Sequence, residues 1–151
     1  MLFIYLYFTS KINTTEPAVQ SGQYLNNYEF LKEDLSKEDK FVMLQAKIFI
    51  ESYFTCVNSD LIYLEGLKFE VTDSFLPKLN EQINLCNNLG SSSSETTVDT
   101  SSIQIESKID NEVNIQMVAN QTMNTKVNKL DLQIDLVKQG DYWLTNNLII
   151  K

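Results

Sequence analysis

The hydrophobic residues of this chain follow two different periods, one after the other. Up to about Asn88 they recur at helical spacing, and after about Val98 they alternate with polar residues as strands do. A serine-rich seam at residues 91–94 separates the two parts. Helices followed by strands predict an α+β domain, in which about three helices cover one face of a four-stranded antiparallel sheet.

The strongest helical signal spans residues 37–57. Ser36, with Asp39 three residues later, resembles a capping box, and acidic residues suit the first turn of a helix. Apolar residues then repeat along one face of the helix: Val42, Ala46, Phe49, Ile50, Tyr53 and Val57. This stripe is widened by Phe41, Leu44, Ile48 and Phe54. Its breadth predicts a helix at the centre of the domain, and Lys47 is predicted to form a solvated ion pair with Glu51.

The other predicted helices are shorter. The first lies at about residues 23–34, and a second, in the stretch with Gly66, is either a short helix that ends near Glu65 or a passage from helix to turn. A third contains Pro77 close to its start, where proline is tolerated because the first backbone N–H groups of a helix have no partner within it. Thr72 or Asp73 is predicted to cap this third helix, since both side chains can accept a hydrogen bond from its first turn.

Four stretches alternate between apolar and polar residues and predict the strands of an antiparallel meander: residues 103–109, 113–119, 130–136 and 142–150. Turns are predicted at residues 110–111 and 139–141, and a flexible loop at 87–97 (NNLGSSSSETT). The polar face of such a sheet meets water, and the helices cover the apolar face. Trp143 either anchors the last strand in the core or serves the outer face.

The amino terminus begins with the apolar run MLFIYLYF at residues 1–8, followed by a polar stretch at 9–23. The run is too short to span a bilayer, which takes about 20 helical residues, and no basic segment precedes it as in a signal peptide. It is the stump of a membrane anchor, a first strand, or a helix packed on the body; the abrupt polar linker favours the stump. We therefore divide the chain into residues 1–22 and a single domain at 23–151.

Composition excludes several classes of function. The net charge is −8, and the 12 basic residues are scattered among 20 acidic ones, which argues against direct nucleic-acid binding. The chain has no His, so His-based catalytic triads and most catalytic zinc sites are excluded. No motif for a cofactor or metal is present. Two cysteines, Cys56 and Cys86, either form a disulfide or are two buried thiols.

The closing segment at residues 137–147 (VKQGDYWLTNN) resembles the penultimate strand, tight turn and final strand of the nuclear transport factor 2-like, cystatin-like cone superfamily. A Lys, a Gly or Asp and a Trp recur there in the same order. The helix at residues 37–57 resembles the packing helix of these proteins, and the resemblance covers about residues 36–151. It implies helices packed on a curved four-stranded sheet.

A narrower group is similar in its layout. An apolar amino terminus, a polar linker and one such domain resemble the membrane-anchored TcpC-type assembly proteins of Gram-positive conjugation and type IV secretion systems. This resemblance implies a protein of the cell membrane whose domain lies on the extracytoplasmic side. It also implies no active site and no cofactor, and assembly with itself and with other proteins of the secretion channel.

Two sets of residues are candidates for function. The outer sheet face offers a surface for protein partners, through Asn114, Gln116, Asn128, Gln133 and Thr145. Some cone-type proteins are enzymes or bind small molecules, and a pocket of that kind would use Tyr53, Asp60, Tyr63 and Asp73. Helix capping is the simpler role for both aspartates. A deep pocket with an inward acid would favour this alternative. A third is a secreted accessory or immunity-type protein. An interior filled by aromatic side chains would favour the scaffold: Phe49, Tyr53, Phe75 and Trp143.

Overall fold

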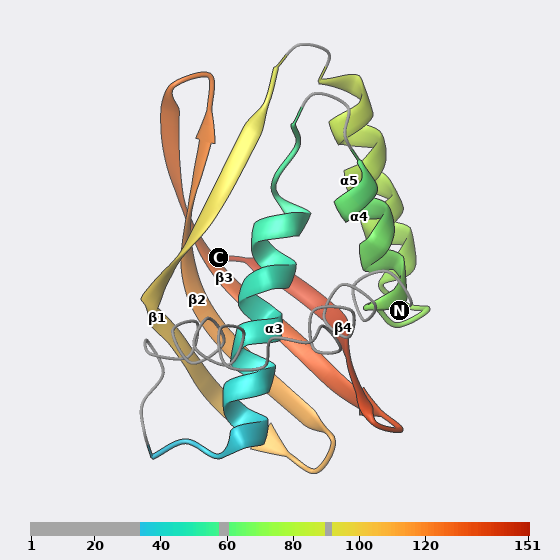
Figure 1. Cartoon of the computed structure of the whole chain (residues 1–151), viewed down its shortest axis with the longest axis vertical. Coiled ribbons are helices and arrows are strands. Elements are labelled where there is room, and N and C mark those ends of the chain that lie inside the picture. The colour runs from blue at the N-terminus through green and yellow to red at the C-terminus, as the bar shows by residue number, and fades with distance from the viewer. Residues whose placement is uncertain (1–33, 58–60, 90–91) are drawn as a thin grey trace, which may run out of the picture.

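The computed structural model describes residues 34–57, 61–89 and 92–151. Within these described residues, three helices and a 3-10 turn precede four strands: α3 (Lys37–Tyr53), α4 (Ile62–Gly66), η1 (Leu67–Phe69), α5 (Leu76–Asn88), β1 (Ser94–Ile109), β2 (Glu112–Met123), β3 (Lys126–Gln139) and β4 (Tyr142–Ile150). The predicted α+β class is confirmed (Figure 1). The helix predicted at 23–34 and the boundary predicted at residues 22–23 fall outside the described residues or at their margin.

The sheet is an antiparallel meander in the order β1-β2-β3-β4. Tight turns connect its strands, and Asp110, Asn124 and Gly140 adopt φ angles of 50°, 48° and 63° there. Positive φ matches the right-handed twist of a hairpin, and Asn, Asp and Gly reach it at low cost. The turns predicted at 110–111 and 139–141 are confirmed; the sequence reading placed no turn at Asn124.

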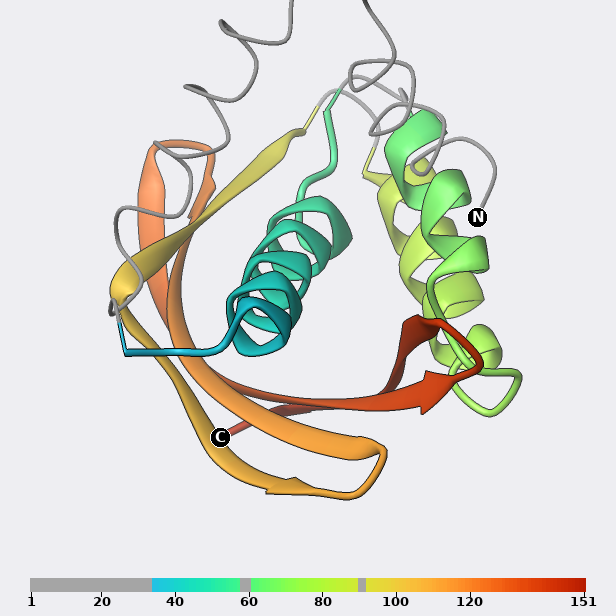
Figure 2. The same cartoon turned by 60° about the horizontal axis from the view of Figure 1, so that its bottom comes forward.

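The sheet curls around α3, as Figure 2 shows. In β1 the register with β2 shifts between Asp99 and Gln104, and inward-facing residues change there from Val98, an even position, to Ile103, an odd one. Such an irregularity bends a strand and increases its twist. Helix α3 lies in the concave face, and α4 and α5 stand on the far side of α3 from β1 (Figures 1 and 2).

Helix α3 begins as predicted. The Ser36 hydroxyl accepts a hydrogen bond of 3.0 Å from the backbone N–H of Asp39. The helix ends at Tyr53, four residues before the predicted end at Val57, because Cys56 instead bridges to Ser94 in strand fashion, with backbone distances of 2.9 and 2.8 Å. The assignment of Val57 to the apolar stripe is therefore wrong.

The apolar stripe is also narrower than predicted, because Phe41 is 49% exposed on α3. The flexible loop predicted at residues 87–97 is wrong at both of its ends. Helix α5 continues to Asn88, and β1 already begins at Ser94. Ser94 is 2% exposed, and its hydroxyl donates to the backbone oxygen of Phe54 at 2.9 Å.

Helix α5 starts without a side-chain cap, so the predicted cap by Thr72 or Asp73 is wrong. Pro77 lies in its first turn as predicted. The Thr72 hydroxyl is engaged elsewhere, since it donates to Oδ1 of Asn146 in β4 at 2.9 Å. The segment around Thr72 also pairs with the outer edge of β4, which places the start of α5 against the sheet.

Cys56 and Cys86 form a disulfide with a Cα–Cα distance of 5.4 Å, and both are buried. Of the two readings of these cysteines, the structure therefore selects the disulfide. It connects the segment after α3 to the end of α5, and closes a loop that contains α4 and η1. The small helices are thus held covalently beside α3.

Candidate functional site: a filled interior and a polar sheet face

The interior between α3 and the sheet is filled by large side chains. Phe49, Tyr53 and Phe75 pack with ring centroids 5.7 to 6.0 Å apart, and all three are at most 5% exposed. Trp143 projects into the concave face from β4 and is 4% exposed. Of the two roles considered for Trp143, the structure therefore selects the core anchor. An interior packed in this way leaves no deep cone for a small molecule at these residues.

The candidate pocket residues do not come together. Tyr53 is buried in the aromatic cluster, whereas Tyr63 on α4 is 68% exposed. Asp73 is exposed, and Asp60 lies outside the described residues. Burial raises the pKa of Tyr53 to about 12, so its phenol stays neutral at physiological pH and cannot act as a base. The three described members of this candidate set, Tyr53, Tyr63 and Asp73, therefore do not line a common pocket, and Asp60 lies outside the described residues.

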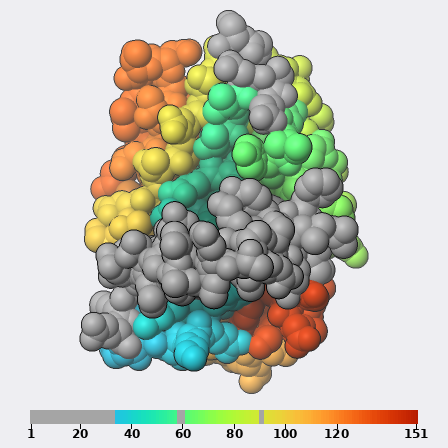
Figure 3. Space-filling model, viewed as in Figure 1, coloured from blue at the N-terminus to red at the C-terminus, as the bar shows by residue number. Residues whose placement is uncertain are grey.

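An open groove of about 410 Å³ does lie beside the carboxyl-terminal half of α3. Its lining residues come from α3, the segment that follows it and α4: Ile48, Glu51, Ser52, Thr55, Val57, Tyr63 and Leu64. In Figure 3 this part of α3 is visible between β1 and α4. The charged group in this lining, Glu51, is already bound, to Lys47 Nζ at 2.9 Å and to the backbone N–H of Val98 at 3.0 Å. Glu51 therefore joins α3 to β1. The sequence analysis predicted only its ion pair with Lys47 and not this contact with the sheet.

The convex face of the sheet carries a row of polar side chains across three strands. Asn114 in β2 donates to one oxygen of Asp135 in β3, and Asn147 in β4 donates to the other at 3.1 Å. Gln116 and Gln133 are cross-strand partners beside this row. As predicted, Asn114, Gln116 and Gln133 belong to the face opposite to the core.

Two residues predicted for that face lie elsewhere. Thr145 is 1% exposed, because β4 holds one extra residue, Asn146, between the partners of Asp135 and Leu136, and this bulge turns Thr145 inward. Asn128 alternates with Leu130 and Leu132 along β3 and therefore belongs to the concave side. The candidate interaction face is reduced to the side chains of Asn114, Gln116 and Gln133.

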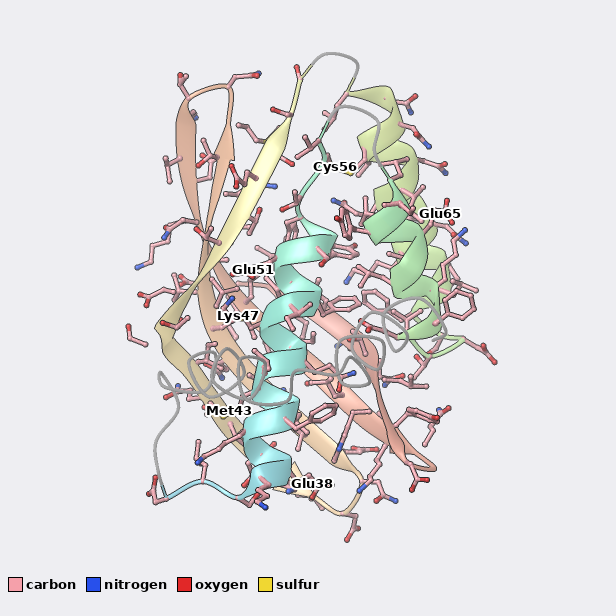
Figure 4. All side chains as sticks on the ribbon, viewed as in Figure 1. Glu38, Met43, Lys47, Glu51, Cys56 and Glu65 are labelled. Carbon is pink, nitrogen blue, oxygen red and sulfur yellow. A yellow bond between two sulfur atoms is a disulfide. The ribbon has the colours of Figure 1, made fainter. Side chains whose placement is uncertain are left out.

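Charged residues close one end of the contact between α3 and the sheet. Lys138 of β3 donates to Glu38 at 2.6 Å, and Lys108 of β1 donates to Glu38 at 3.2 Å and to Asp39 at 2.7 Å. Figure 4 shows Glu38 at the foot of α3. These hydrogen bonds hold the pKa of Glu38 below its usual value, and the bond from Lys138 has the largest effect. Lys138 also lies 5.6 Å from the centre of the Trp143 ring.

Another titrating group lies where the sequence gave no signal. Burial raises the pKa of Glu70 to about 7, and Glu70 belongs to the segment that pairs with β4 through Thr145. The Glu70 side chain is half-buried, and no side-chain hydrogen bond or ion pair to its carboxyl is formed within the described residues. Within the same residues, no group of three or more Cys, Asp or Glu side chains is arranged to hold a metal ion. None of the helices described between residues 34 and 151 is long and apolar enough to cross a membrane.

Comparisons with known proteins give likeness in fold only. No protein family model matches the sequence, and no curated protein matches it at a significant level. Among solved structures, CagV of Helicobacter pylori strain 26695, a VirB8 homologue of a type IV secretion system, is similar with a TM-score of 0.58 and 16% identity. The match covers 73% of this chain and 95% of CagV.

A second similar structure is that of TraH, a putative transfer protein from the Gram-positive conjugative plasmid pIP501, solved in solution by NMR. Its TM-score is 0.53 at 15% identity, and the match covers 79% of this chain and 96% of TraH. The two matches together show that the described domain has the fold of these two proteins, nearly over their whole solved length.

Proposed function

We propose that this chain is a non-enzymatic assembly protein of a conjugative transfer or type IV secretion apparatus, and that its domain acts through contacts with other proteins of the channel. The likeness to CagV and TraH supports this proposal, since both come from such systems by their descriptions. A shared fold does not establish a shared function, so the proposal also needs evidence from the residues of the candidate site. The observation that carries it is the filled interior, in which Phe49, Tyr53, Phe75 and Trp143 occupy the space a substrate would need.

The proposal places the domain on the extracytoplasmic side of the cell membrane. The buried disulfide between Cys56 and Cys86 supports this location, because such bonds persist in oxidising compartments and are rare in the cytosol. The apolar run at residues 1–8 supports attachment to the membrane as part of an anchor. On the same proposal the chain is a member of the nuclear transport factor 2-like superfamily, close to its TcpC-type proteins, and self-association accompanies its contacts in the channel.

The contact surface that we propose is the convex face around Asn114, Gln116 and Gln133. The Asn114 side chain on this surface is ordered by its bond to Asp135, which also accepts from Asn147, so a partner would meet a group there with little side-chain entropy left to lose. Amide groups offer both donors and acceptors, which suits recognition by complementary hydrogen bonds and not by charge alone.

The test is conjugative transfer from donor cells that lack this chain. We expect transfer to fall on deletion and to be restored by the wild type. The double variant Gln116→Arg/Gln133→Arg should fail to restore it at equal protein level, because two bulky charges would disrupt the convex face. Asn80→Arg, on the exposed side of α5, is the matched control and should restore transfer. Undiminished transfer from the deletion strain would overturn the proposal.

Location is tested separately. In a Cys56→Ser/Cys86→Ser chain that carries Asn80→Cys at an exposed position of α5, a membrane-impermeant thiol reagent applied to intact cells should label residue 80 if the domain lies outside the membrane. Labelling that appears only after lysis would contradict the extracytoplasmic placement while leaving a role in transfer open.

A further inference from the structure

Strand β4 is shorter than the strand it pairs with, and this leaves part of β3 without a neighbour. β3 has 14 residues and β4 has 9. Pairing with β4 reaches back to Leu132, which faces Ile150, and the backbone N–H of Lys151 donates to the oxygen of Asp131 at 2.9 Å. Beyond this point no described strand lies along the outer side of residues 126–130. Figure 1 shows the β2–β3 hairpin standing clear above the end of β4.

The backbone groups at this open edge can be identified from the register. Because Asp131 bonds toward β4, the odd-numbered residues of β3 direct their N–H and C=O groups to that side. The corresponding groups of Val127 and Lys129 therefore face outward, and no bond to them is formed from the described residues. Their side chains are well exposed, with 60% for Val127. Figure 3 shows the hairpin at the margin of the molecule.

Comparable edges of the same sheet are covered by the chain itself. In β1, the N–H groups of Thr96 and Val98 donate to the side chains of Thr55 and Glu51. In β4, Thr145 bonds on its outer side to Glu70 and Thr72, and the backbone oxygen of Leu148 accepts from Lys78. An uncovered strand edge is a template for pairing with another chain. The edge at residues 126–130 differs from these because no residue that the structure describes pairs with it.

The side chains at the open edge favour one kind of occupant. Lys126 and Lys129 are both exposed there, in a chain whose net charge is −8. Val127 on the convex side and Ile150, 57% exposed beside the lower end of the edge, add apolar surface. Pairing of two copies of this chain through the edge would gather two pairs of lysines in one short stretch, which resists self-association.

We propose that the edge of β3 at residues 126–130 receives an extended segment of a partner protein, antiparallel to β3 and in line with β4, in which acidic and apolar residues alternate with the strand period. The residue opposite Lys129 is acidic and lies on the convex side. Its neighbours, on the concave side, are apolar and extend the contact that Leu130 makes with the core. The edge is present whether or not the chain serves a transfer apparatus.

The experiment uses the full chain and a short blocked peptide in which Glu alternates with Val. Amide hydrogen exchange should slow at Val127 and Lys129 when this peptide is present, while the already paired amide of Leu130 serves as internal reference. Lys129→Pro removes the outward N–H group without breaking a hydrogen bond within the sheet. The variant should bind the peptide about tenfold more weakly, which is the effect of one lost main-chain hydrogen bond. Lys129→Thr keeps the N–H and is the matched control, with weaker binding only through the lost charge.

Charge reversal gives a second, independent variant. The variant Lys126→Glu/Lys129→Glu should no longer bind the acidic peptide. It should instead bind a peptide of the same length that has Lys in place of Glu. Unchanged exchange at Val127 and Lys129, or equal binding by Lys129→Pro and wild type, would overturn the proposal. A wild-type dimer in light scattering that Lys129→Pro converts to monomer would overturn the choice of occupant, because a second copy would then fill the edge.

Discussion

Gln45 in α3 donates a hydrogen bond from Nε2 to the backbone oxygen of Trp143 in β4, at 2.6 Å and across 98 residues of sequence. The Trp143 oxygen points away from β3, since Lys138 and Trp143 are a pair that exchanges no bonds in the ladder. The helix thus satisfies a backbone group that the sheet leaves open. This contact positions α3 along the last strand of the sheet.

Replacing Gln45 by Leu should destabilise the protein. The apolar side chain leaves the part-buried Trp143 oxygen without its hydrogen bond from α3, which costs about 1–3 kcal/mol. Chemical denaturation measures the change in the free energy of unfolding. Gln139→Leu, at an exposed position, is the matched control and should stay within about 0.5 kcal/mol of the wild type. Equal effects from both variants would show that the Gln45 contact adds no stability.

Two phenylalanines on α3 should differ strongly when truncated. Phe49→Ala removes a ring that is 1% exposed and leaves a cavity in the aromatic cluster, at a cost of about 3–5 kcal/mol. Phe41→Ala removes a ring that is 49% exposed, and should cost less than about 1 kcal/mol. Thermal and urea unfolding of the two variants would test the assignment of the core. A large loss from Phe41→Ala would contradict it.

Loss of the disulfide should lower stability by about 2–4 kcal/mol, because the unfolded chain regains freedom in the loop between Cys56 and Cys86. The double variant Cys56→Ser/Cys86→Ser should melt at a lower temperature than the wild type. Reductant should lower the melting temperature of the wild type and leave that of the double variant unchanged. A wild type insensitive to reductant, with free thiols by mass spectrometry, would refute the bond.

Acid should weaken the end of the fold where Glu38 meets Lys138 and Lys108. Hydrogen bonds from these lysines hold the pKa of Glu38 below its usual 4.5. The stabilisation is therefore complete above the unfolded pKa, and is lost as the pH falls through the lower folded pKa. Glu38→Gln should flatten the pH dependence of stability in this acidic range.

Glu106→Gln is the control for this change, since Glu106 is exposed and forms no ion pair within the described residues. Its pH profile should follow that of the wild type. Carbon-13 titration of the Glu38 carboxyl gives the pKa directly, and a value at or above 4.5 would contradict the ion contacts.

Hydrophobic period by itself determined the secondary structure and the class of the fold. The stripe through Val42, Ala46 and Phe49 can lie on one side only in a helix, and the alternation in β2, β3 and β4 can do so only in strands. Local capping chemistry at Ser36 likewise fixed where α3 begins. These signals act between near neighbours in sequence, so no knowledge of distant contacts was needed.

The tertiary structure decided what depends on contacts between distant residues. Helix α3 ends early because Ser94 offers Cys56 a strand partner. Thr145 turns into the core because of the bulge at Asn146, and this removes it from the predicted surface. Tyr53 and Tyr63 separate because one packs inside the sheet while the other lies on α4. All three outcomes depend on contacts between residues far apart in the sequence.

The open edge at residues 126–130 shows the same division. The alternation of β3 and β4 could be found in the sequence, but their lengths appear only when the register sets Leu132 against Ile150. An exposed backbone edge has no sequence signature, because every residue except proline carries the same N–H and C=O groups. Sequence determined which segments become helix and strand, and only the packing of those segments decided which surfaces remain available for a partner.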